Sequence, residues 1–264
     1  MKKFFSVILL MALVLSLCSG SFADGSGLRG YSAEDGYIYL SLGTYPAEAD
    51  GARAPVLWRV LDVSDGKALV LSDKILDVQQ VIFCDNKKDS DARKFRKISA
   101  FTESDLFVWM NGTMLEDLCS EQDFRSLLIE RELGFLYPLT EEQLLNPDYG
   151  FSKTRWVDDS KRLACRQFFA TEYAKEHELY EGYTTPAMNK LCVDGKWGSS
   201  SAWGANVKNP KDIKLTLIGV NGHLSYGVYT RVNIGVLPAM TLDLSLLRIT
   251  GGTGSAEDPF LLDF

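Results

Sequence analysis

Hydrophobic and polar positions alternate in the first third of the chain. Residues 37–43 (YIYLSLG) have the period of two that is typical of a half-buried strand. Residues 56–63 (VLWRVLDV) and 67–72 (KALVLS) lie on either side of Asp65 and Gly66. An Asp-Gly step between two alternating apolar runs is a strong hairpin signal. The pattern therefore predicts one strand followed by a tight β-hairpin.

The same alternation returns in the last third. Residues 213–220 and 223–232 alternate on either side of an Asn-Gly step, which predicts a second hairpin. Residues 236–244 (VLPAMTLDL) predict a further strand.

Between these groups of strands the apolar spacing changes to that of helices. The pattern predicts four helices. The first covers 102–114 with an N-cap at Ser104, the second begins at Ser120, and the third is a short helix that begins at Thr140. The fourth covers 164–177, with Phe168, Phe169 and Tyr173 on its buried side. Gly112 is expected to weaken or end the first of them. Thr140 and Gln143 have the spacing of a capping box. The order of strands, helices and strands favours an α+β domain whose terminal strands share an antiparallel sheet.

The first 23 residues have the composition of a secretory signal peptide. Lys2 and Lys3 precede an apolar run over 4–17, and Ser21 and Ala23 are small residues at the positions that a signal peptidase reads. The run is shorter than the roughly 20 residues that span a bilayer. We expect cleavage after Ala23, no transmembrane segment after cleavage, and a secreted or surface-associated protein.

The rest of the chain is then divided by composition. Residues 24–36 are rich in Gly, Ser and charge and predict a flexible lead-in, 37–244 form the domain, and 245–264 form a glycine-containing appendage. Cleavage and lipid anchoring at Cys18 is the less favoured alternative, because bulky Leu17 stands where a lipobox has a small residue.

Charge and cysteine content exclude several classes of partner. The formal net charge is −7, so no diffuse basic field is present to hold nucleic acid. Beyond the signal peptide stand four cysteines, for which both disulfide bridges and free buried thiols remain open: Cys84, Cys119, Cys165 and Cys192. None has the spacing of a zinc site, and we expect no metal or other cofactor.

Motifs of known chemistry are missing from the sequence. The two histidines, His177 and His223, belong to different predicted elements and are interpreted as surface residues. The chain has no HExxH, GxSxG or Walker motif, and no GxGxxG that opens a predicted helix after a predicted strand. These observations predict a protein that is not an enzyme.

The candidate ligand-binding residues are Trp197, Trp203 and Asn206. They lie in a Gly- and Ser-rich segment, 195–206, which predicts a loop that presents flat aromatic surfaces to carbohydrate or protein ligands. The alternative is that one or both tryptophans fold inward and pack in the core.

Several motifs resemble a domain of unknown function that is common in exported proteins of Gram-positive anaerobic bacteria. The matching segments cover most of 37–244 and are GTYPAEADGARAPVLWRVLDVSDGKALVLSDKILD (43–77), SDLFVWMNGTML (104–115), FLYPLTEEQL (135–144), TEYAKEHELY (171–180) and GVLPAMTLDL (235–244). Residues 251–260 resemble a glycine-rich GGxGTxxDPY repeat of bacterial surface proteins.

That family is distantly similar to the formylglycine-generating, sulfatase-modifying enzymes, so the resemblance implies a C-type-lectin-like fold. Those enzymes use a reactive cysteine pair near the C-terminal core, whereas residues 195–244 here contain no cysteine. The sequence therefore predicts an exported, non-catalytic binding or interaction module for a carbohydrate or surface protein. The alternatives are an enzyme related to the sulfatase-modifying group and a structural spacer of the cell envelope.

Overall fold

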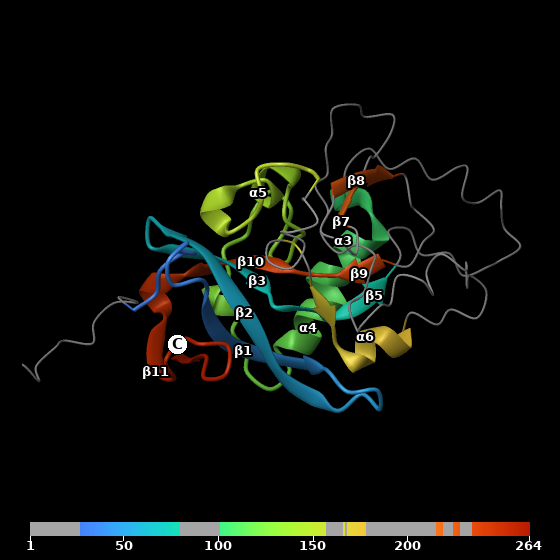
Figure 1. The fold of residues 1–264 in the computed structure, drawn as a ribbon. Coiled ribbons are helices and arrows are strands. Elements are labelled where there is room, and N and C mark those ends of the chain that lie inside the picture. Colours follow the sequence, from blue (N-terminus) through green and yellow to red (C-terminus); the bar gives the residue numbers. More distant parts are fainter. Residues whose placement is uncertain are drawn as a thin grey trace, which may run out of the picture.

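Strands from both ends of the chain build one six-stranded sheet. A computed structural model describes residues 27–79, 101–156, 166, 168–177, 215–218, 224–227 and 234–264. The strands of the sheet are β1 (Ile38–Pro46), β2 (Arg53–Ser64), β3 (Lys67–Ser72), β10 (Ala239–Asp243), β11 (Arg248–Gly251) and β12 (Phe260–Asp263). Their order is β10-β3-β2-β1-β12-β11, and neighbours run antiparallel except for β1 and β12 (Figure 1). The described part is a mixed α and β fold with a mostly sheet core and few helices.

The predicted first hairpin is confirmed as β2 and β3. Ser64 pairs with Lys67, and the two residues between them have positive φ angles, 51° at Asp65 and 70° at Gly66. Positive φ at both central positions is the geometry of a type I′ turn, whose twist matches that of the strands. The predicted strand over 37–43 is the start of β1.

The C-terminal residues extend the sheet at the free edge of β1. Leu40 of β1 is in register with Phe260 of β12, and the backbone N–H of Tyr39 donates to the carbonyl of Gly254 over 2.9 Å. Gly252 has a φ of 81°, and a Cβ there would lie 2.0 Å from the carbonyl oxygen of Pro259. Residues 245–264, predicted as an appendage, are thus hydrogen-bonded to the domain.

The first predicted helix is longer than expected. It comprises α3 (Asp105–Trp109), a π-helical turn (Met110–Met114) and α4 (Leu115–Leu118). The hydroxyl of Ser104 accepts the N–H of Phe107 over 3.0 Å, which confirms the N-cap. Gly112 does not end the helix, because the apolar residues beyond it, from Met114 to Leu118, are buried against the sheet.

Two other helix predictions are wrong in extent. The stretch from Ser120 forms only a 3-10 turn at Arg125–Leu127. Within 164–177, α6 (Glu172–His177) is preceded by β6 (Phe169–Ala170), which pairs in parallel with β4 (Lys74–Ile75). Backbone pairing with β4 therefore overrides the helical spacing, and Phe169 is exposed rather than buried. The short helix after Thr140 is confirmed as α5 (Glu141–Leu144), with both capping-box hydrogen bonds present.

The predicted second hairpin is present among the described residues, and the strand predicted after it is divided in two. β7 (Leu215–Ile218) and β8 (Leu224–Gly227) pair antiparallel as the second hairpin, and the Asn-Gly step between them lies outside the described residues. The strand over 236–244 is divided at Leu237 and Pro238. Before the break, β9 (Ile234–Val236) pairs with β5 (Asp77–Gln79), whereas β10 follows it and pairs with β3.

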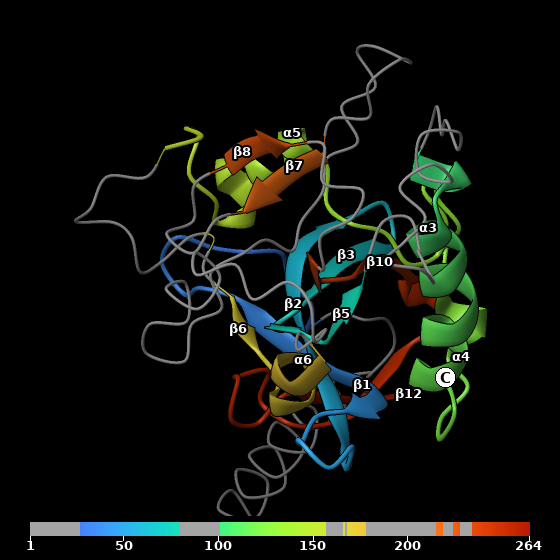
Figure 2. The ribbon, with the colours of Figure 1, turned by 90° about the vertical axis from the view of Figure 1, so that its right-hand side faces the viewer.

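Apolar side chains cover the sheet in two clusters. One contains Leu40, Trp58 and Val70 and packs against α3 and α4. The other contains Leu69 and Leu71 and packs against α5, α6 and β8. Figure 2 shows α3 and α4 on one side of the sheet and the β7–β8 hairpin with α5 on the other. None of the helices in the described part of the chain is long and apolar enough to cross a membrane.

Candidate functional site

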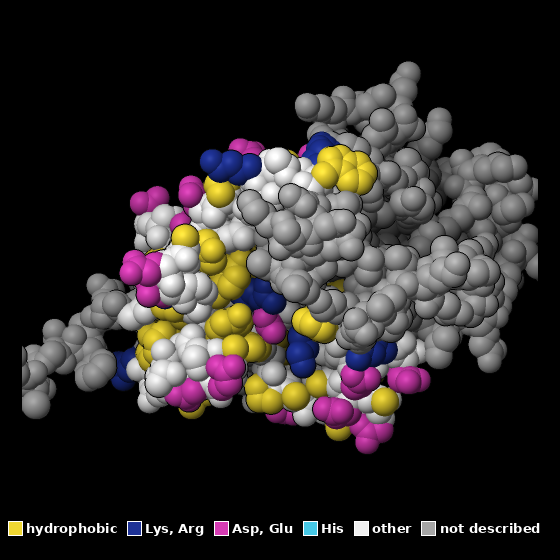
Figure 3. Space-filling view, in the orientation of Figure 1, with side chains coloured by type: hydrophobic (Ala, Val, Ile, Leu, Met, Phe, Trp, Pro, Cys, Tyr) yellow, Lys and Arg dark blue, Asp and Glu magenta, His cyan; other side chains and the backbone are white. Residues whose placement is uncertain are grey.

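A pocket of about 620 Å³ lies beside the turn between β2 and β3, and we call it the β2–β3 pocket. Its lining comes from that turn, from residues 130–133, from the start of α5, and from single side chains of β10 and the segment after α5. The lining residues are Asp62, Ser64, Asp65, Lys67, Leu69, Glu130, Arg131, Glu132, Leu133, Tyr137, Thr140, Gln143, Tyr149 and Thr241. Figure 3 shows acidic side chains at the left edge of the surface, where this turn lies in Figure 1.

The hairpin supplies one wall of this pocket. The β2–β3 register shifts between Val60 and Asp62, and a bulge of this kind re-aims the side chains that follow it. Asp62 is half-buried and accepts a hydrogen bond of 2.8 Å from the hydroxyl of Ser64. The tight turn then places Asp65 and Lys67 at the exposed rim.

The opposite wall is a second tight turn. Arg131 and Gly134 exchange backbone hydrogen bonds of 3.0 and 2.9 Å, and Gly134 has a φ of 94°. The chain before and after this turn is bridged to β10, at Leu242 and Ala239. The turn is therefore fixed to the sheet, and its charged residues stand beside the hairpin.

The floor of the pocket is a pair of buried hydroxyl groups. The hydroxyls of Tyr137 and Thr241 lie 2.6 Å apart, and these residues are 5% and 6% exposed. Burial raises the pKa of Tyr137, with Thr241 and Arg131 acting in the opposite direction, so the phenol is neutral at physiological pH. The pair holds two hydroxyl hydrogens and uses one of them internally.

Charges around the pocket are unevenly balanced. Four carboxylates and two cationic side chains line it, and no ion pair joins them within the described residues. Burial raises the pKa of Tyr149, the Asp62 carboxylate adds to this, and Arg131 opposes it. The phenol of Tyr149 therefore interacts electrostatically with a charged residue of each wall, Asp62 and Arg131.

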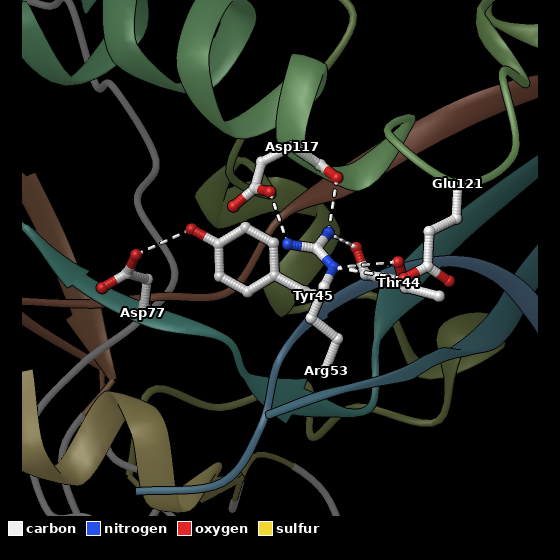
Figure 4. A network of polar contacts seen from close by, with 6 residues as sticks. All are labelled: Thr44, Tyr45, Arg53, Asp77, Asp117 and Glu121. Atoms are coloured by element: carbon white, nitrogen blue, oxygen red, sulfur yellow. Dashed lines mark hydrogen bonds and ion pairs between the residues drawn. The ribbon is translucent and has the colours of Figure 1, made fainter. Parts of the chain in front are cut away.

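A second polar cluster centres on the buried carboxylate of Asp77. Asp77 accepts hydrogen bonds from the Tyr45 hydroxyl over 2.7 Å and from the Val78 N–H over 2.7 Å, and His177 Nδ1 lies 3.1 Å away (Figure 4 shows the tyrosine contact). Burial raises the pKa of Asp77 despite these partners. Burial, together with Asp77, also raises the pKa of Tyr45. The cluster joins β1, β5 and α6.

Arg53 forms a neighbouring network that joins β2 to the end of α4. Its guanidinium donates to the carboxylate and the carbonyl of Asp117, each over 2.6 Å, and to the carbonyl and hydroxyl of Thr44 (Figure 4). The Glu121 carboxylate lies 3.6 Å from Nε. All its near contacts are internal to the fold, which indicates a structural role.

The residues predicted from sequence are distributed differently. Trp197, Trp203 and Asn206 lie outside the described residues, as do Cys84, Cys165 and Cys192. Cys119 is free and buried at the end of α4, and burial raises the pKa of its thiol. His177 ends α6 as predicted, although it contacts Asp77.

Sequence reasoning missed the β2–β3 pocket. The hairpin turn and the capping box at Thr140 were both visible, and each supplies pocket residues. Their proximity could not be predicted, because it depends on β10, which pairs both with β3 and with Tyr137, each more than a hundred residues earlier in the chain. Comparisons with protein-family models, curated proteins and solved structures found no match to this chain.

Proposed function

We propose that this protein is an exported, non-catalytic binding module that holds a carbohydrate in the β2–β3 pocket. The observation that carries the proposal is a pocket of about 620 Å³ lined by polar side chains and two tyrosines. Ligand sites have volumes of roughly 300 to 1,000 Å³. The volume suits a short oligosaccharide.

The polar groups are held in fixed positions, which favours recognition of a polyol. Thr140 and Gln143 are locked by the capping box, Ser64 by Asp62, and Tyr137 by Thr241. Sugar hydroxyls are both donors and acceptors, and such preorganised partners reduce the ordering cost of binding. Tyrosine adds apolar area with a polar end.

The acidic residues of the pocket do not suit glycoside hydrolysis. That reaction needs one carboxyl group kept protonated by an apolar environment. Asp65, Glu130 and Glu132 are exposed, and Asp62 is half-buried and bonded to a hydroxyl. Their surroundings favour binding over catalysis.

Within the mixed α and β class, we propose that the fold is that of a C-type-lectin-like domain. Its support is the sheet that pairs strands from both ends of the chain with helices inserted between them. Export to the medium or cell surface is proposed from the first 23 residues. The Trp197–Asn206 region remains a predicted second contact for the same ligand or for a surface protein.

A titration of the mature chain with β-linked trisaccharides, followed by calorimetry, tests the function. Tyr149→Ala and Thr241→Val remove an aromatic wall and half of the floor pair, and we expect each to weaken binding by at least about tenfold. Tyr39→Ala, outside the pocket, is the matched control and should bind normally. No binding by any trisaccharide would exclude the pocket and favour the envelope spacer, whereas equal binding by all variants would mean that the carbohydrate binds outside this pocket.

A further inference from the structure

The floor of the β2–β3 pocket holds one hydroxyl hydrogen without an acceptor. Tyr137 and Thr241 are each more than nine-tenths buried and share one hydrogen bond of 2.6 Å. Whichever hydroxyl donates, the O–H of the other remains an unsatisfied donor, because no further side chain among the described residues accepts its hydrogen. A buried donor without an acceptor is destabilising, so an oxygen of the ligand is its natural partner.

The rim of the pocket carries an excess of negative charge. Asp65, Glu130 and Glu132 are exposed carboxylates without a basic partner in the described part of the chain. With Asp62 they outnumber Lys67 and Arg131, so the field at the rim is negative. A cationic group is favoured there.

These four carboxylates are not arranged as a metal site. No group of three or more His, Cys, Asp or Glu residues among the described residues is placed to hold a metal ion. The carboxylates are instead spread over two walls, at the hairpin turn and at the turn closed by Gly134. This spacing suits an organic cation whose body fills the pocket between them.

We infer that the ligand is an amino sugar with a free, protonated amine. A sugar oxygen accepts the spare hydroxyl hydrogen of the Tyr137 and Thr241 pair, and the ammonium group lies among the rim carboxylates. The inference rests on the proposed function, since it names the class of carbohydrate that the same pocket holds. A lysine-rich peptide also carries ammonium groups, but it has no comparable set of hydroxyls for the locked polar lining.

The test compares four probes at pH 6, where a primary amine is protonated. They are a β-1,4-linked glucosamine trimer, its N-acetylated form, the neutral glucose trimer and trilysine. We expect the glucosamine trimer to bind about three- to tenfold more tightly than the N-acetylated and neutral trimers. This preference should shrink when sodium chloride is raised from about 50 to 500 mM, because salt screens exposed charges.

Variants place the effect in the pocket. Glu130→Gln combined with Glu132→Gln should remove most of the preference for the amine, measured as the ratio of the affinities for the glucosamine trimer and the neutral trimer. Lys67→Gln should increase the preference. Glu48→Gln, an exposed change outside the pocket, should alter neither, and thermal unfolding confirms that each variant is folded.

The outcomes separate this inference from the proposed function. If the three trisaccharides bind equally, the pocket binds carbohydrate but the amine preference is refuted. If trilysine binds as tightly as the glucosamine trimer, the pocket recognises charge alone and the amino-sugar assignment is refuted. If no trisaccharide binds, the proposed function itself fails.

Discussion

At the scale of residues, the same side-chain type has opposite roles in two parts of this protein. Asp77 is buried, and its carboxylate contacts only groups of its own fold. Glu130 and Glu132 are exposed at the rim of a pocket and have no basic partner in the described structure. Burial and internal hydrogen bonds indicate a structural acid, whereas exposure at a cavity indicates an acid that is available to a ligand.

Asp77 makes folding stability depend on pH. Burial raises its pKa in the folded protein, so the folded state holds this proton more tightly than the unfolded chain does. Its stabilising contribution is complete below the unfolded pKa, about 3.9, and is lost as the pH rises through the folded pKa. We expect the stability of the wild type relative to Asp77→Asn to fall as the pH rises from 4 towards 7.

Urea unfolding at several pH values measures this difference. The same series in a His177→Gln background separates the carboxylate from the imidazole beside it. A difference that does not change between pH 4 and 7 would mean that Asp77 has its ordinary pKa, and the interpretation of this cluster would be wrong.

At the scale of elements, short sequence motifs correctly predicted the turns and caps that depend only on neighbouring residues. The β2–β3 turn and the capping box at Thr140 depend on residues within four positions of each other, and both are confirmed. The helix expected over 164–177 was wrong at Phe169, because backbone pairing of β6 with β4 overrides helical spacing. The pocket could not be predicted from local patterns either, because its floor is formed by two residues that are 104 positions apart in the sequence.

Two glycines give an opposed pair of predictions. Gly66 has a φ of 70° and open space around its Cβ position, so Gly66→Ala should destabilise the protein by about 1–2 kcal/mol through the backbone alone. Gly112 lies in the helical run with equally open space and an ordinary φ, so Gly112→Ala should stabilise the protein by about 0.5–1 kcal/mol. Chemical denaturation of both variants provides the comparison. Destabilisation by Gly112→Ala would contradict the continuous helix from Asp105 to Leu118.

At the scale of the whole molecule, the sheet depends on both ends of the chain. β12 lies between β1 and β11, and Leu247 and Leu262 belong to the main apolar cluster. The pocket depends on β10 and on the β2–β3 hairpin in the same sheet. The binding site is thus a property of the assembled domain rather than of any one motif.

Removing residues 245–264 tests this view. The deletion uncovers the edge of β1 and removes two buried leucines, so it should lower the free energy of unfolding by at least about 4 kcal/mol. Deleting Phe264 alone, which is exposed, is the control and should have little effect. If the protein without residues 245–264 were as stable as the full-length protein, the segment would be an appendage and not part of the domain.

The central claim is that the β2–β3 pocket holds a carbohydrate. A crystal structure of the mature chain with the glucosamine trimer bound tests it most directly. We expect the trimer in this pocket, with an oxygen in hydrogen-bond distance of the Tyr137 and Thr241 hydroxyls and an amine facing Glu130 or Glu132. A trimer bound elsewhere, such as at Trp197 and Trp203, with the pocket empty would contradict it.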